Sequence, residues 1–282
     1  MAAGMGTRFG KYTELIPKGF VEYKQRAMVV RSIDTLIACG VERIIIGTGW
    51  KKESYEALAA RYNALYGEDG PARLPHPVHL ECVYSPRYAE TNSMYTLWNC
   101  REAIGDDDFL LLESDLVFEP RAIRELMECE FGSAMLITPV TKFQDQYYVQ
   151  MDARKRLVNC STDRNAIDPS GELVGIHKLS NAFYQSVVTE YGKVMADQPK
   201  LGYEFQLLLT SQKGVEMADA ASAASPMPSG RTEPVPGRSA DAQANPAPGN
   251  YIMNVLRLEG LQWYEIDDQN DLEWAEAHVD ID

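Results

Sequence analysis

The sequence has few cysteines and histidines and no long apolar run. Its five cysteines are odd in number and form no Cys-x-x-Cys pair, so neither a disulfide framework nor a zinc site is expected, and we predict a reducing, cytoplasmic location. Its four histidines show no His-Glu-x-x-His spacing, the pattern in which two histidines on one helix face hold zinc. No run of about 18 apolar residues occurs, so no membrane span is predicted.

Basic residues are also scarce, with 27 Lys and Arg against 41 Asp and Glu, a formal net charge of −14. We therefore expect no nucleic-acid partner, because binding to a phosphate backbone depends on lysines and arginines that neutralise it. The same charge does not exclude a small anionic ligand, since a few local cations, a metal ion or a helix N-terminus can bind one. With 282 residues, the chain is long enough for one large domain or two small ones.

Short β-branched runs alternate with helical apolar spacing along most of the chain. Residues 27–39 have helical spacing, and residues 41–48 form a run typical of a buried parallel strand. Further strands are predicted at residues 80–84, 108–114, 134–140, 147–152, 156–161, 173–179, 252–258 and 262–266, and further helices at residues 52–66, 91–104, 119–129, 181–196, 203–212 and 270–279. This alternation with short connections predicts an α/β domain with a mostly parallel sheet.

Residues 218–250 interrupt this pattern with a composition rich in Ala, Pro, Ser and Gly and nearly without large apolar side chains. Such a segment cannot bury enough surface to offset the entropy of ordering it. We predict a disordered insertion within a single domain that spans residues 1–282. A substrate lid or a partner-binding arm is the alternative, because connections of this length are either functional or disordered.

The N-terminal segment carries the clearest chemical signal. Gly4 and Gly6 let the backbone approach a ligand closely, and the N–H groups of such a turn can bind an anion. Arg8 follows the glycines, and Lys18 comes directly after Pro17, which stiffens the approach of this second cation. Glycines alone more often serve turns. The combination of glycines with two nearby cations predicts a phosphate-binding site.

A carboxylate follows one of the predicted buried strands. Asp115 comes just after the apolar run at residues 109–112, at the strand end where α/β sheets bind ligands. Mg²⁺ prefers oxygen ligands and usually takes one or two carboxylates together with substrate phosphates. Asp115 is therefore a candidate metal ligand. The alternative is a cap for the helix that begins near Pro120.

The sequence AAGMGTRFG, followed by Pro17-Lys18, resembles the signature of nucleotidyltransferases that couple a nucleoside triphosphate to a phosphorylated small molecule and release pyrophosphate. The resemblance covers nearly the whole chain outside residues 218–250. It implies a Rossmann-like fold with a mixed, mostly parallel central sheet flanked by helices. It also implies that Arg8 contacts the departing pyrophosphate and that Lys18 bridges the α-phosphate and the attacking phosphate. The residues implied to hold the triphosphate and the base are Ala2, Ala3, Gly4, Met5, Gly6 and Thr7.

The resemblance further implies a magnesium site made by two carboxylates. Asp115 matches the position that holds the metal in the family. Residues 263–268 resemble a late strand-Asp-helix element of the family, whose Asp supplies the second carboxylate. Asp267 is the matching position, with Asp268 as a close rival, and Asp271 is expected to cap the last helix.

Residues 90–98 (ETNSMYTLW) resemble a segment of the phosphocholine and aminoethylphosphonate cytidylyltransferases. This likeness implies that CTP is the nucleotide and that Thr91, Asn92 and Ser93 help to read its pyrimidine. Short polar side chains at a helix start can do so through amide and hydroxyl hydrogen bonds. A plain helix cap by Thr91 or Asn92 is the alternative.

The resemblance to these cytidylyltransferases implies an acceptor with an ammonium group. A quaternary ammonium favours an aromatic cage, whereas a primary ammonium has N–H donors that favour carboxylate partners. The candidates for these contacts are Asp145, Tyr147, Tyr148, Tyr203, Glu204 and Trp263, with Asp145, Tyr147, Tyr203 and Glu204 foremost. The resemblance favours 2-aminoethylphosphonate as the acceptor. Phosphocholine, a sugar 1-phosphate and a catalytically inactive nucleotide-binding module remain alternatives, and a homodimer is left open.

The start of the sequence departs from the family pattern. Members of the family have a central strand just before the Ala-Ala-Gly turn, whereas this sequence starts inside the turn at Met1. A sheet without that strand would expose backbone donors and apolar faces. We therefore expect a gap in the sheet, and a lower stability than that of a chain with the upstream residues restored.

Overall fold

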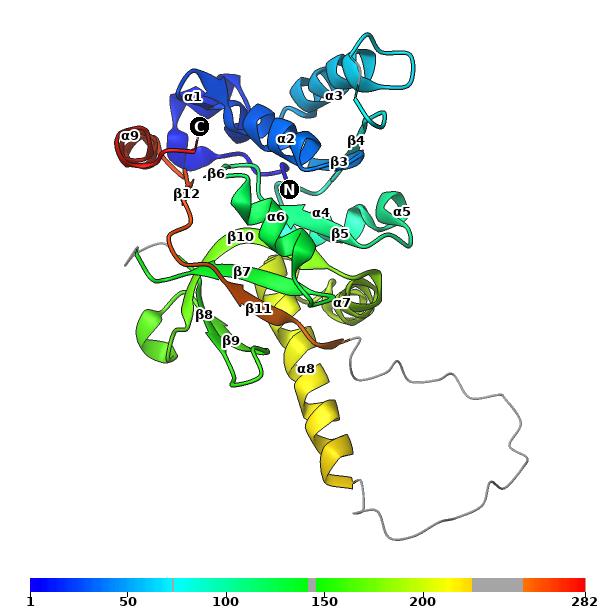
Figure 1. Cartoon of the computed structure of the whole chain (residues 1–282), viewed down its shortest axis with the longest axis vertical. Helices are drawn as coiled ribbons and strands as arrows, with labels where there is room; N and C mark the ends of the chain where they lie inside the picture. The colour runs from blue at the N-terminus through cyan, green and yellow to red at the C-terminus, as the bar shows by residue number, and fades with distance from the viewer. Residues whose placement is uncertain (73, 142–145, 225–250, 282) are drawn as a thin grey trace, which may run out of the picture.

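The computed structural model describes residues 1–72, 74–141, 146–224 and 251–281. A twisted sheet crosses the middle of the molecule and carries helices on both faces (Figure 1). Its strands follow in the order β11 (Asn254–Arg257), β7 (Ala134–Thr138), β10 (Gly171–Leu179), β8 (Tyr148–Met151) and β9 (Leu157–Ser161), and β5 (Phe109–Leu112) also pairs with β10. The long strand β10 contacts β5 through residues 176–179 and β8 through residues 171–172, so it joins the two ends of the sheet.

Three two-stranded pairs complete the described strands. They are the parallel pair β3 (Arg43–Thr48) and β4 (His79–Tyr84), the antiparallel pair β6 (Leu116–Phe118) and β12 (Trp263–Glu265), and the hairpin β1 (Glu22–Tyr23) and β2 (Arg26–Ala27). The predicted α/β class and the mixed sheet are confirmed. The expectation that most pairings are parallel is wrong for the described strands, because β10 runs antiparallel to β5, β7 and β8, and only β3·β4 and β7·β11 are parallel.

The helices follow the apolar spacing of the sequence closely. They are α1 (Lys11–Leu15), α2 (Met28–Ala38), α3 (Lys52–Tyr66), α4 (Ser93–Asn99), α5 (Arg101–Ile104), α6 (Arg121–Glu128), α7 (Asn181–Val194), α8 (Tyr203–Ala224) and α9 (Gln269–His278), with the 3₁₀ turns η1 (Thr7–Phe9), η2 (Lys18–Phe20) and η3 (Arg164–Ala166). Among the described residues, no helix combines the length and the apolar character needed to cross a membrane.

Helix α8 is longer than the sequence predicts. It continues to Ala224, so residues 218–224 of the predicted disordered insertion are helical. The reason is local, since these residues are rich in alanine, the residue with the highest helix propensity. Residues 225–250 of the predicted insertion lie outside the described residues.

Apolar side chains fill the space on both faces of the central sheet. On one face, Ile33 of α2 and Leu126 of α6 pack in one cluster with Leu136 of β7. On the other face, Phe183 of α7 and Leu207 of α8 pack in a second cluster with other strand residues. Leu136 is fully buried, so its truncation to Ala would cost about 2–5 kcal/mol. This packing makes the sheet a rigid support for the loops at its edge.

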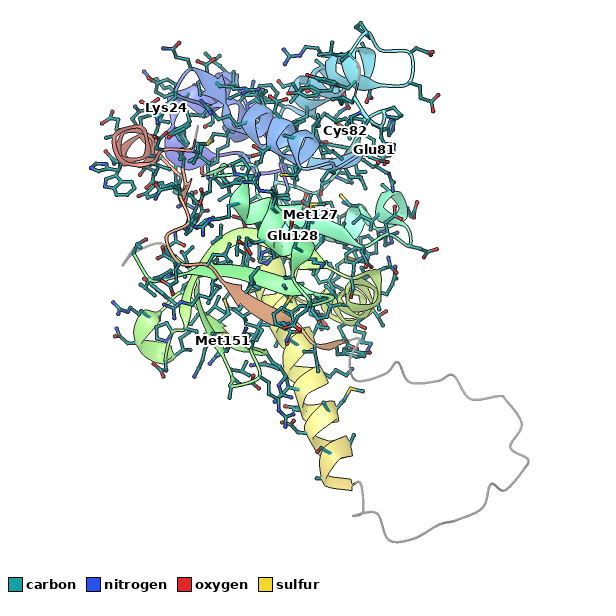
Figure 2. All side chains as sticks on the ribbon, viewed as in Figure 1. Lys24, Glu81, Cys82, Met127, Glu128 and Met151 are labelled. Atoms are coloured by element: carbon teal, nitrogen blue, oxygen red, sulfur yellow. The ribbon has the colours of Figure 1, made fainter. Side chains whose placement is uncertain are left out.

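The pair β3·β4, with α2 and α3, forms an upper part of the molecule that is separate from the central sheet (Figure 1). Figure 2 shows Glu81 and Cys82 of β4 in this upper part and Met151 of β8 in the lower part, with Met127 and Glu128 of α6 between them. Apolar side chains join the two parts, since Ile33 of α2 and Leu126 of α6 belong to one cluster.

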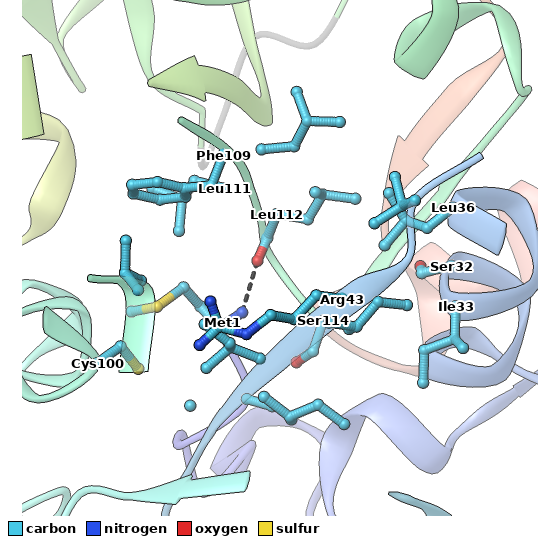
Figure 3. Close-up of a pocket in the computed structure, with 18 of the residues that line it drawn as sticks. Met1, Ser32, Ile33, Leu36, Arg43, Cys100, Phe109, Leu111, Leu112 and Ser114 are labelled. Atoms are coloured by element: carbon cyan, nitrogen blue, oxygen red, sulfur yellow. Dashed lines mark hydrogen bonds between the residues drawn. The ribbon is translucent and has the colours of Figure 1, made fainter. Parts of the chain in front are cut away.

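A cavity with a volume of about 490 Å³ lies between β3 and β5 (Figure 3). Its walls are mostly apolar and include Ile33, Leu36, Ile46 and Leu111. Within the described part of the chain, β3 pairs along its length with β4 alone and β5 with β10 alone, so each has one edge that faces the cavity.

The chain enters this cavity at its first two residues. The ammonium of Met1 donates to the carbonyl oxygen of Leu112 at 2.6 Å, and the backbone N–H of Ala2 donates to the carbonyl oxygen of Gly47 at 2.8 Å. Burial lowers the pKa of the Met1 ammonium. Residues 1–2 thus contact both facing strands, while most of the length between those strands is hollow.

Candidate active site

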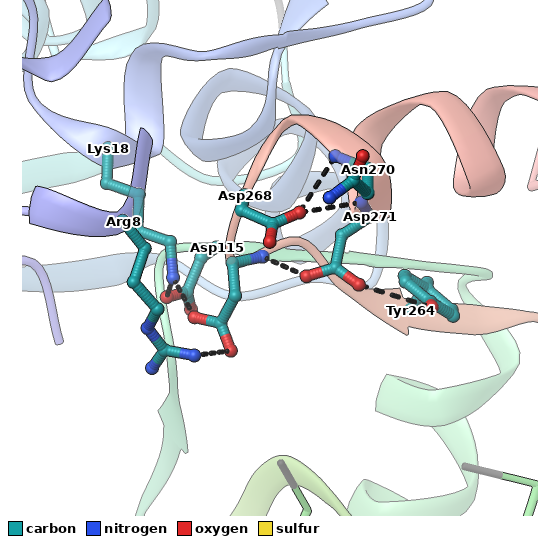
Figure 4. Close-up of polar contacts among 8 residues, drawn as sticks. Arg8, Lys18, Asp115, Tyr264, Asp268, Asn270 and Asp271 are labelled. Atoms are coloured by element: carbon teal, nitrogen blue, oxygen red, sulfur yellow. Dashed lines mark hydrogen bonds and ion pairs between the residues drawn. The ribbon is translucent and has the colours of Figure 1, made fainter. Parts of the chain in front are cut away.

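Lys18 lies at the centre of a network of charged side chains (Figure 4). Its Nζ lies 2.5 Å from Oδ2 of Asp115 and 2.5 Å from Oδ1 of Asp267. The other oxygen of Asp267, Oδ2, accepts from Nη1 of Arg8 at 2.8 Å. The fold thus brings together four residues that the sequence singled out: Lys18 from η2, Arg8 from η1, Asp115 from the turn between β5 and β6, and Asp267 from the segment after β12.

Charge is balanced inside this network, which contains two cations and two carboxylates. Burial by itself would lower the pKa of Lys18, but the charges of Asp115 and Asp267 outweigh burial and raise that pKa. Lys18 therefore stays protonated at physiological pH. An ammonium has three N–H donors, and two of them serve the carboxylates. The third N–H of Lys18 can donate a hydrogen bond to an anionic oxygen of a ligand.

Gly6 places the N-terminal loop directly against Lys18. Its φ of 61° lies in the left-handed region, and a Cβ at this position would lie 2.9 Å from Cβ of Lys18 and 3.0 Å from Cγ2 of Thr13. The carbonyl oxygen of Gly6 accepts from the hydroxyl of Thr13 at 2.7 Å. A larger residue would displace the lysine, so glycine is required here. The loop also exposes Gly4, Met5 and Thr7 to solvent beside the cations, where a ligand can reach them.

The three acidic residues after β12 have separate tasks. Asp268 is the N-cap of α9, because its carboxylate accepts from the backbone N–H groups of Asn270 at 2.8 Å and Asp271 at 3.0 Å. The prediction that Asp271 caps this helix is therefore wrong. An N-cap carboxylate bonds N–H groups two and three residues further on, and Asp268 has that offset. Asp271 instead accepts from the backbone N–H of Asp267 at 3.0 Å, which orients the residue that contacts Lys18.

Asp115 does not cap the following helix either. Helix α6 begins after Pro120 without a side-chain cap, and Asp115 contacts Lys18 instead. Of the two interpretations that the sequence left open, the helix cap is wrong, and the metal role of Asp115 remains a prediction.

A group of carboxylates adjoins the Lys18 network. Glu113, Asp115 and Glu265 offer oxygen atoms that all lie within 4.8 Å of one another. Burial raises the pKa of Glu113 well above its usual value, and the charges of Glu265, Asp115 and Glu204 raise it further. Burial also raises the pKa of Glu204 to about 7, and its Oε2 has no hydrogen-bond partner among the described residues. A cation from a ligand would therefore stabilise this region.

The sequence interpretation missed two members of this group. Glu113 and Glu265 each precede a predicted metal ligand by two residues, Asp115 and Asp267 respectively. Side chains two residues apart along an extended chain point to the same side, so this spacing was a usable signal.

These oxygen ligands fit a divalent cation such as Mg²⁺, which binds carboxylates and substrate phosphates. Asp115 belongs both to the carboxylate group and to the Lys18 network. Asp267 contacts Lys18 and Arg8, and it meets Asp115 across the same ammonium. The pairing of Asp115 with Asp267 on one metal remains a prediction.

Two of the residues expected to contact the acceptor, Tyr203 and Tyr147, lie near these carboxylates. Tyr203 is fully buried, and its hydroxyl donates to Oε1 of Glu113 at 2.6 Å. Tyr147 packs edge-on against Phe205 with ring centroids 5.6 Å apart. Its pKa is raised by burial first and by the charge of Glu204 next, which places it near that carboxylate. Asp145 lies outside the described residues.

The segment predicted to read the pyrimidine serves the fold. Asn92 is the N-cap of α4, since its side chain accepts from the backbone N–H of Ser93 at 2.8 Å. The hydroxyl of Thr91 donates to the carbonyl oxygen of Arg87 at 2.6 Å, and Oγ of Ser93 accepts from the backbone N–H of Tyr203 at 3.0 Å. The cap interpretation thus holds for Asn92, while contact with a base remains a prediction.

These features define the class of protein. The profile of the MobA-like NTP transferase domain matches residues 1–166, so the chain belongs to this family of nucleotidyltransferases. Three solved or curated proteins illustrate the relationship. The fold resembles that of the CTP:phosphocholine cytidylyltransferase from Streptococcus pneumoniae, with a TM-score of 0.64 and 18% identity over 98% of this chain and 95% of that chain.

Two relatives share sequence similarity. The chain is 23% identical to the CMP-5′-(3-aminopropyl)phosphonate synthase of Streptomyces rubellomurinus over 98% of this chain and 37% of that protein. It is 29% identical to the 2-aminoethylphosphonate cytidylyltransferase of Lancefieldella rimae over 47% of this chain and 49% of that protein. The matches thus span less than half the length of these two curated relatives.

Proposed function

We propose that this chain is a CTP-dependent cytidylyltransferase that transfers CMP to 2-aminoethylphosphonate and releases pyrophosphate. The observation that carries the proposal is the placement of Glu113, Glu204 and Glu265 beside the network of Lys18 and Asp115. A site for an anionic group and a region that needs a cation lie side by side. An aminophosphonate has both charges, and the names of the relatives above support that class of acceptor.

In the proposed reaction, a phosphonate oxygen attacks the α-phosphorus of CTP in line. A new P–O bond forms, the bond between the α- and β-phosphates breaks, and its electron pair leaves with pyrophosphate. The attacking oxygen is already anionic near neutral pH, so no general base is required. Such a transfer is accelerated mainly by positioning and charge stabilisation.

The chain offers one cation for the reacting phosphorus groups and another for the leaving pyrophosphate. The third N–H of Lys18 would hold an oxygen of the α-phosphate or of the attacking phosphonate. Arg8, whose side chain is 62% exposed, would stabilise the departing pyrophosphate at the mouth of the site. Asp115 and Asp267 would hold Mg²⁺, which when bound neutralises phosphate charge and orients the phosphates.

The acceptor ammonium would lie among Glu113, Glu204 and Glu265. A primary ammonium donates three hydrogen bonds, and these carboxylates supply the acceptors. Phosphocholine has no N–H on its cation and would depend on aromatic faces, with Tyr147 the described candidate. A sugar 1-phosphate carries no positive charge, so it would leave these three carboxylates without a counter-charge from the acceptor.

Pyrophosphate release with a panel of nucleotides and acceptors tests the proposal. The acceptors are 2-aminoethylphosphonate, ethylphosphonate, phosphocholine and glucose 1-phosphate, each with CTP and then with UTP, GTP and ATP. We expect the highest kcat/KM with CTP and 2-aminoethylphosphonate. Ethylphosphonate lacks only the ammonium, and its kcat/KM should be lower by at least about 10-fold, the value of one charged hydrogen bond.

Other outcomes of the panel would point elsewhere. A preference for phosphocholine or for glucose 1-phosphate would replace the proposed acceptor by that compound. A preference for another nucleotide would contradict the role of CTP. No release with any combination would favour the nucleotide-binding module without catalytic activity.

A further inference from the structure

Two buried polar side chains lead from Glu113 into the core. The hydroxyl of Tyr203 donates to Oε1 of Glu113 at 2.6 Å, and the same phenol oxygen lies 3.1 Å from Nε2 of His177. His177 and Tyr203 are fully buried, and their rings meet edge-on with centroids 5.3 Å apart. The three residues come from the end of β5, from α8 and from β10, so distant parts of the sequence build one chain of hydrogen bonds.

The direction of these hydrogen bonds follows from the protons available. When Glu113 is ionised, as it must be to bind an ammonium, the phenol proton goes to Glu113, so the phenol oxygen must accept from Nε2 of His177. Burial lowers the pKa of His177 to about 3, so the ring is neutral and has a single proton to donate. That proton lies on Nε2. Its Nδ1 has no hydrogen-bond partner among the described residues, which agrees with an imidazole whose one proton is committed to Tyr203.

Strand β10 makes room for the other oxygen of Glu113. The register of β10 against β7 shifts between Leu173 and His177, and Gly175 lies within this irregular stretch with a φ of 81°. A Cβ at Gly175 would lie 2.8 Å from Oε2 of Glu113. The backbone N–H of Glu113 donates to the carbonyl oxygen of Gly175 at 3.2 Å. The carboxylate is thus held at Oε1 by Tyr203 and confined at Oε2 by the glycine.

We propose that His177 and Tyr203 are positioning residues that set the selectivity for an aminated acceptor. They hold the Glu113 carboxylate in one orientation, and His177 acts through Tyr203. A carboxylate that is fixed before binding does not have to be ordered when the ammonium arrives, so more of the interaction free energy appears as affinity. This inference rests on the proposed function, because it assumes that Glu113 meets the acceptor ammonium.

The test compares two buried tyrosines in the full chain. Tyr203→Phe removes the hydroxyl that contacts Glu113, and Tyr191→Phe removes a buried hydroxyl with no hydrogen-bond partner among the described residues. We measure KM and kcat for 2-aminoethylphosphonate, for ethylphosphonate and for CTP. Tyr203→Phe should raise KM for 2-aminoethylphosphonate about 10-fold, the effect of one charged hydrogen bond, and leave KM for ethylphosphonate and CTP unchanged. Tyr191→Phe should leave all three unchanged.

Two variants of His177 test the hydrogen bond between His177 and Tyr203. His177→Leu removes the donor to Tyr203, and His177→Gln keeps an N–H donor. The Leu variant should reduce the preference for 2-aminoethylphosphonate, and the Gln variant should retain most of it. The double variant His177→Leu/Tyr203→Phe should be no less selective than Tyr203→Phe alone, because residues that act through one another are not additive.

The outcomes separate this inference from the function on which it rests. A wild-type chain that does not prefer 2-aminoethylphosphonate over ethylphosphonate overturns both. A wild-type preference that Tyr203→Phe retains overturns the positioning role alone, as do equal losses with both acceptors. If Tyr203→Phe does not fold, the comparison of His177→Leu with His177→Gln decides. The quantity compared is again the preference for 2-aminoethylphosphonate over ethylphosphonate.

Discussion

Two regions of opposite chemistry meet at the end of β5. Up to Leu112, the strand lines an apolar cavity of about 490 Å³. From Glu113 onward, the chain enters a site crowded with charged side chains that includes Lys18 and Asp115. Glu113 lines the cavity and also belongs to the charged site, so an apolar hollow directly adjoins a site where charges are packed together.

The two regions differ in what each can still accommodate: ligand charges in one, and apolar side chains in the other. The charged site already pairs Lys18 with two carboxylates, and its remaining capacity is for ligand charges. The cavity has two strand edges and apolar walls, so it can still bury further apolar side chains. Changes in the first region should therefore alter turnover, and changes in the second should alter the free energy of unfolding.

The largest effect is expected from Lys18→Ala. The variant removes the cation that contacts both carboxylates, so kcat for pyrophosphate release should fall by about 10²–10³-fold, as for the loss of one transition-state donor. Lys11→Ala changes an exposed lysine near the same loop and should have nearly normal kcat. Circular dichroism checks that both variants fold. Near-normal turnover by Lys18→Ala would refute the role of this lysine.

The cavity provides the second prediction, and it concerns stability alone. Five apolar residues added before Met1 would extend the chain between β3 and β5 and would replace the buried ammonium by an amide. Burial of two such side chains is worth about 3 kcal/mol or more, so Tm should rise by several degrees. An extension of five Ser and Gly residues is the control. Equal melting temperatures for the two extended chains would contradict the expectation that this cavity can accommodate a further apolar strand.

A matched pair of aspartates sharpens the comparison within the charged site. Asp267→Asn should raise the Mg²⁺ concentration for half-maximal activity by about 10-fold or more, because a charged metal ligand is lost. Asp268→Asn should leave it nearly unchanged, since Asn is as good an N-cap as Asp. Magnesium titrations of the initial rate measure both. Equal shifts in the two variants would argue against Asp267 as the metal ligand.

The smallest effect is a pH dependence from Glu204. Because burial raises its pKa from 4.5 to about 7, the folded chain holds this proton more tightly than the unfolded chain does. The stability associated with the proton is full below about pH 4.5 and is lost as pH rises towards 7. The ionised form, which binds an ammonium, is populated above pH 7. KM for 2-aminoethylphosphonate should therefore fall as pH rises from 6 to 8.

Glu204→Gln is the control for that profile. The variant cannot ionise at this position, so its KM should be about 10-fold higher at pH 8 and should depend less on pH. Its Tm should also change less than that of the wild type between pH 5 and 8. A wild-type KM profile that matches the variant profile would show that Glu204 does not contact the acceptor.

Local patterns were sufficient for most of the secondary structure. Helical apolar spacing placed α2 and α7, and β-branched runs placed β3 and β7, each within a few residues. The end of α8 was missed because the Ala-rich composition that indicated disorder also favours helix. The antiparallel pairings of β10 were missed because strand direction depends on contacts between distant segments, which apolar patterning does not encode.

The sequence by itself determined the residue types of the site and their place after predicted strands: glycines with Arg8 and Lys18 near the start, and Asp115 and Asp267 far along the chain. Only the tertiary structure decided which neighbouring carboxylate faces Lys18 and which caps a helix, because a shift of one residue turns a side chain to another direction. It also decided that Glu113 is held by Tyr203 and His177. Residues separated by 64 to 90 positions can be seen to act together only when the sheet brings them into contact.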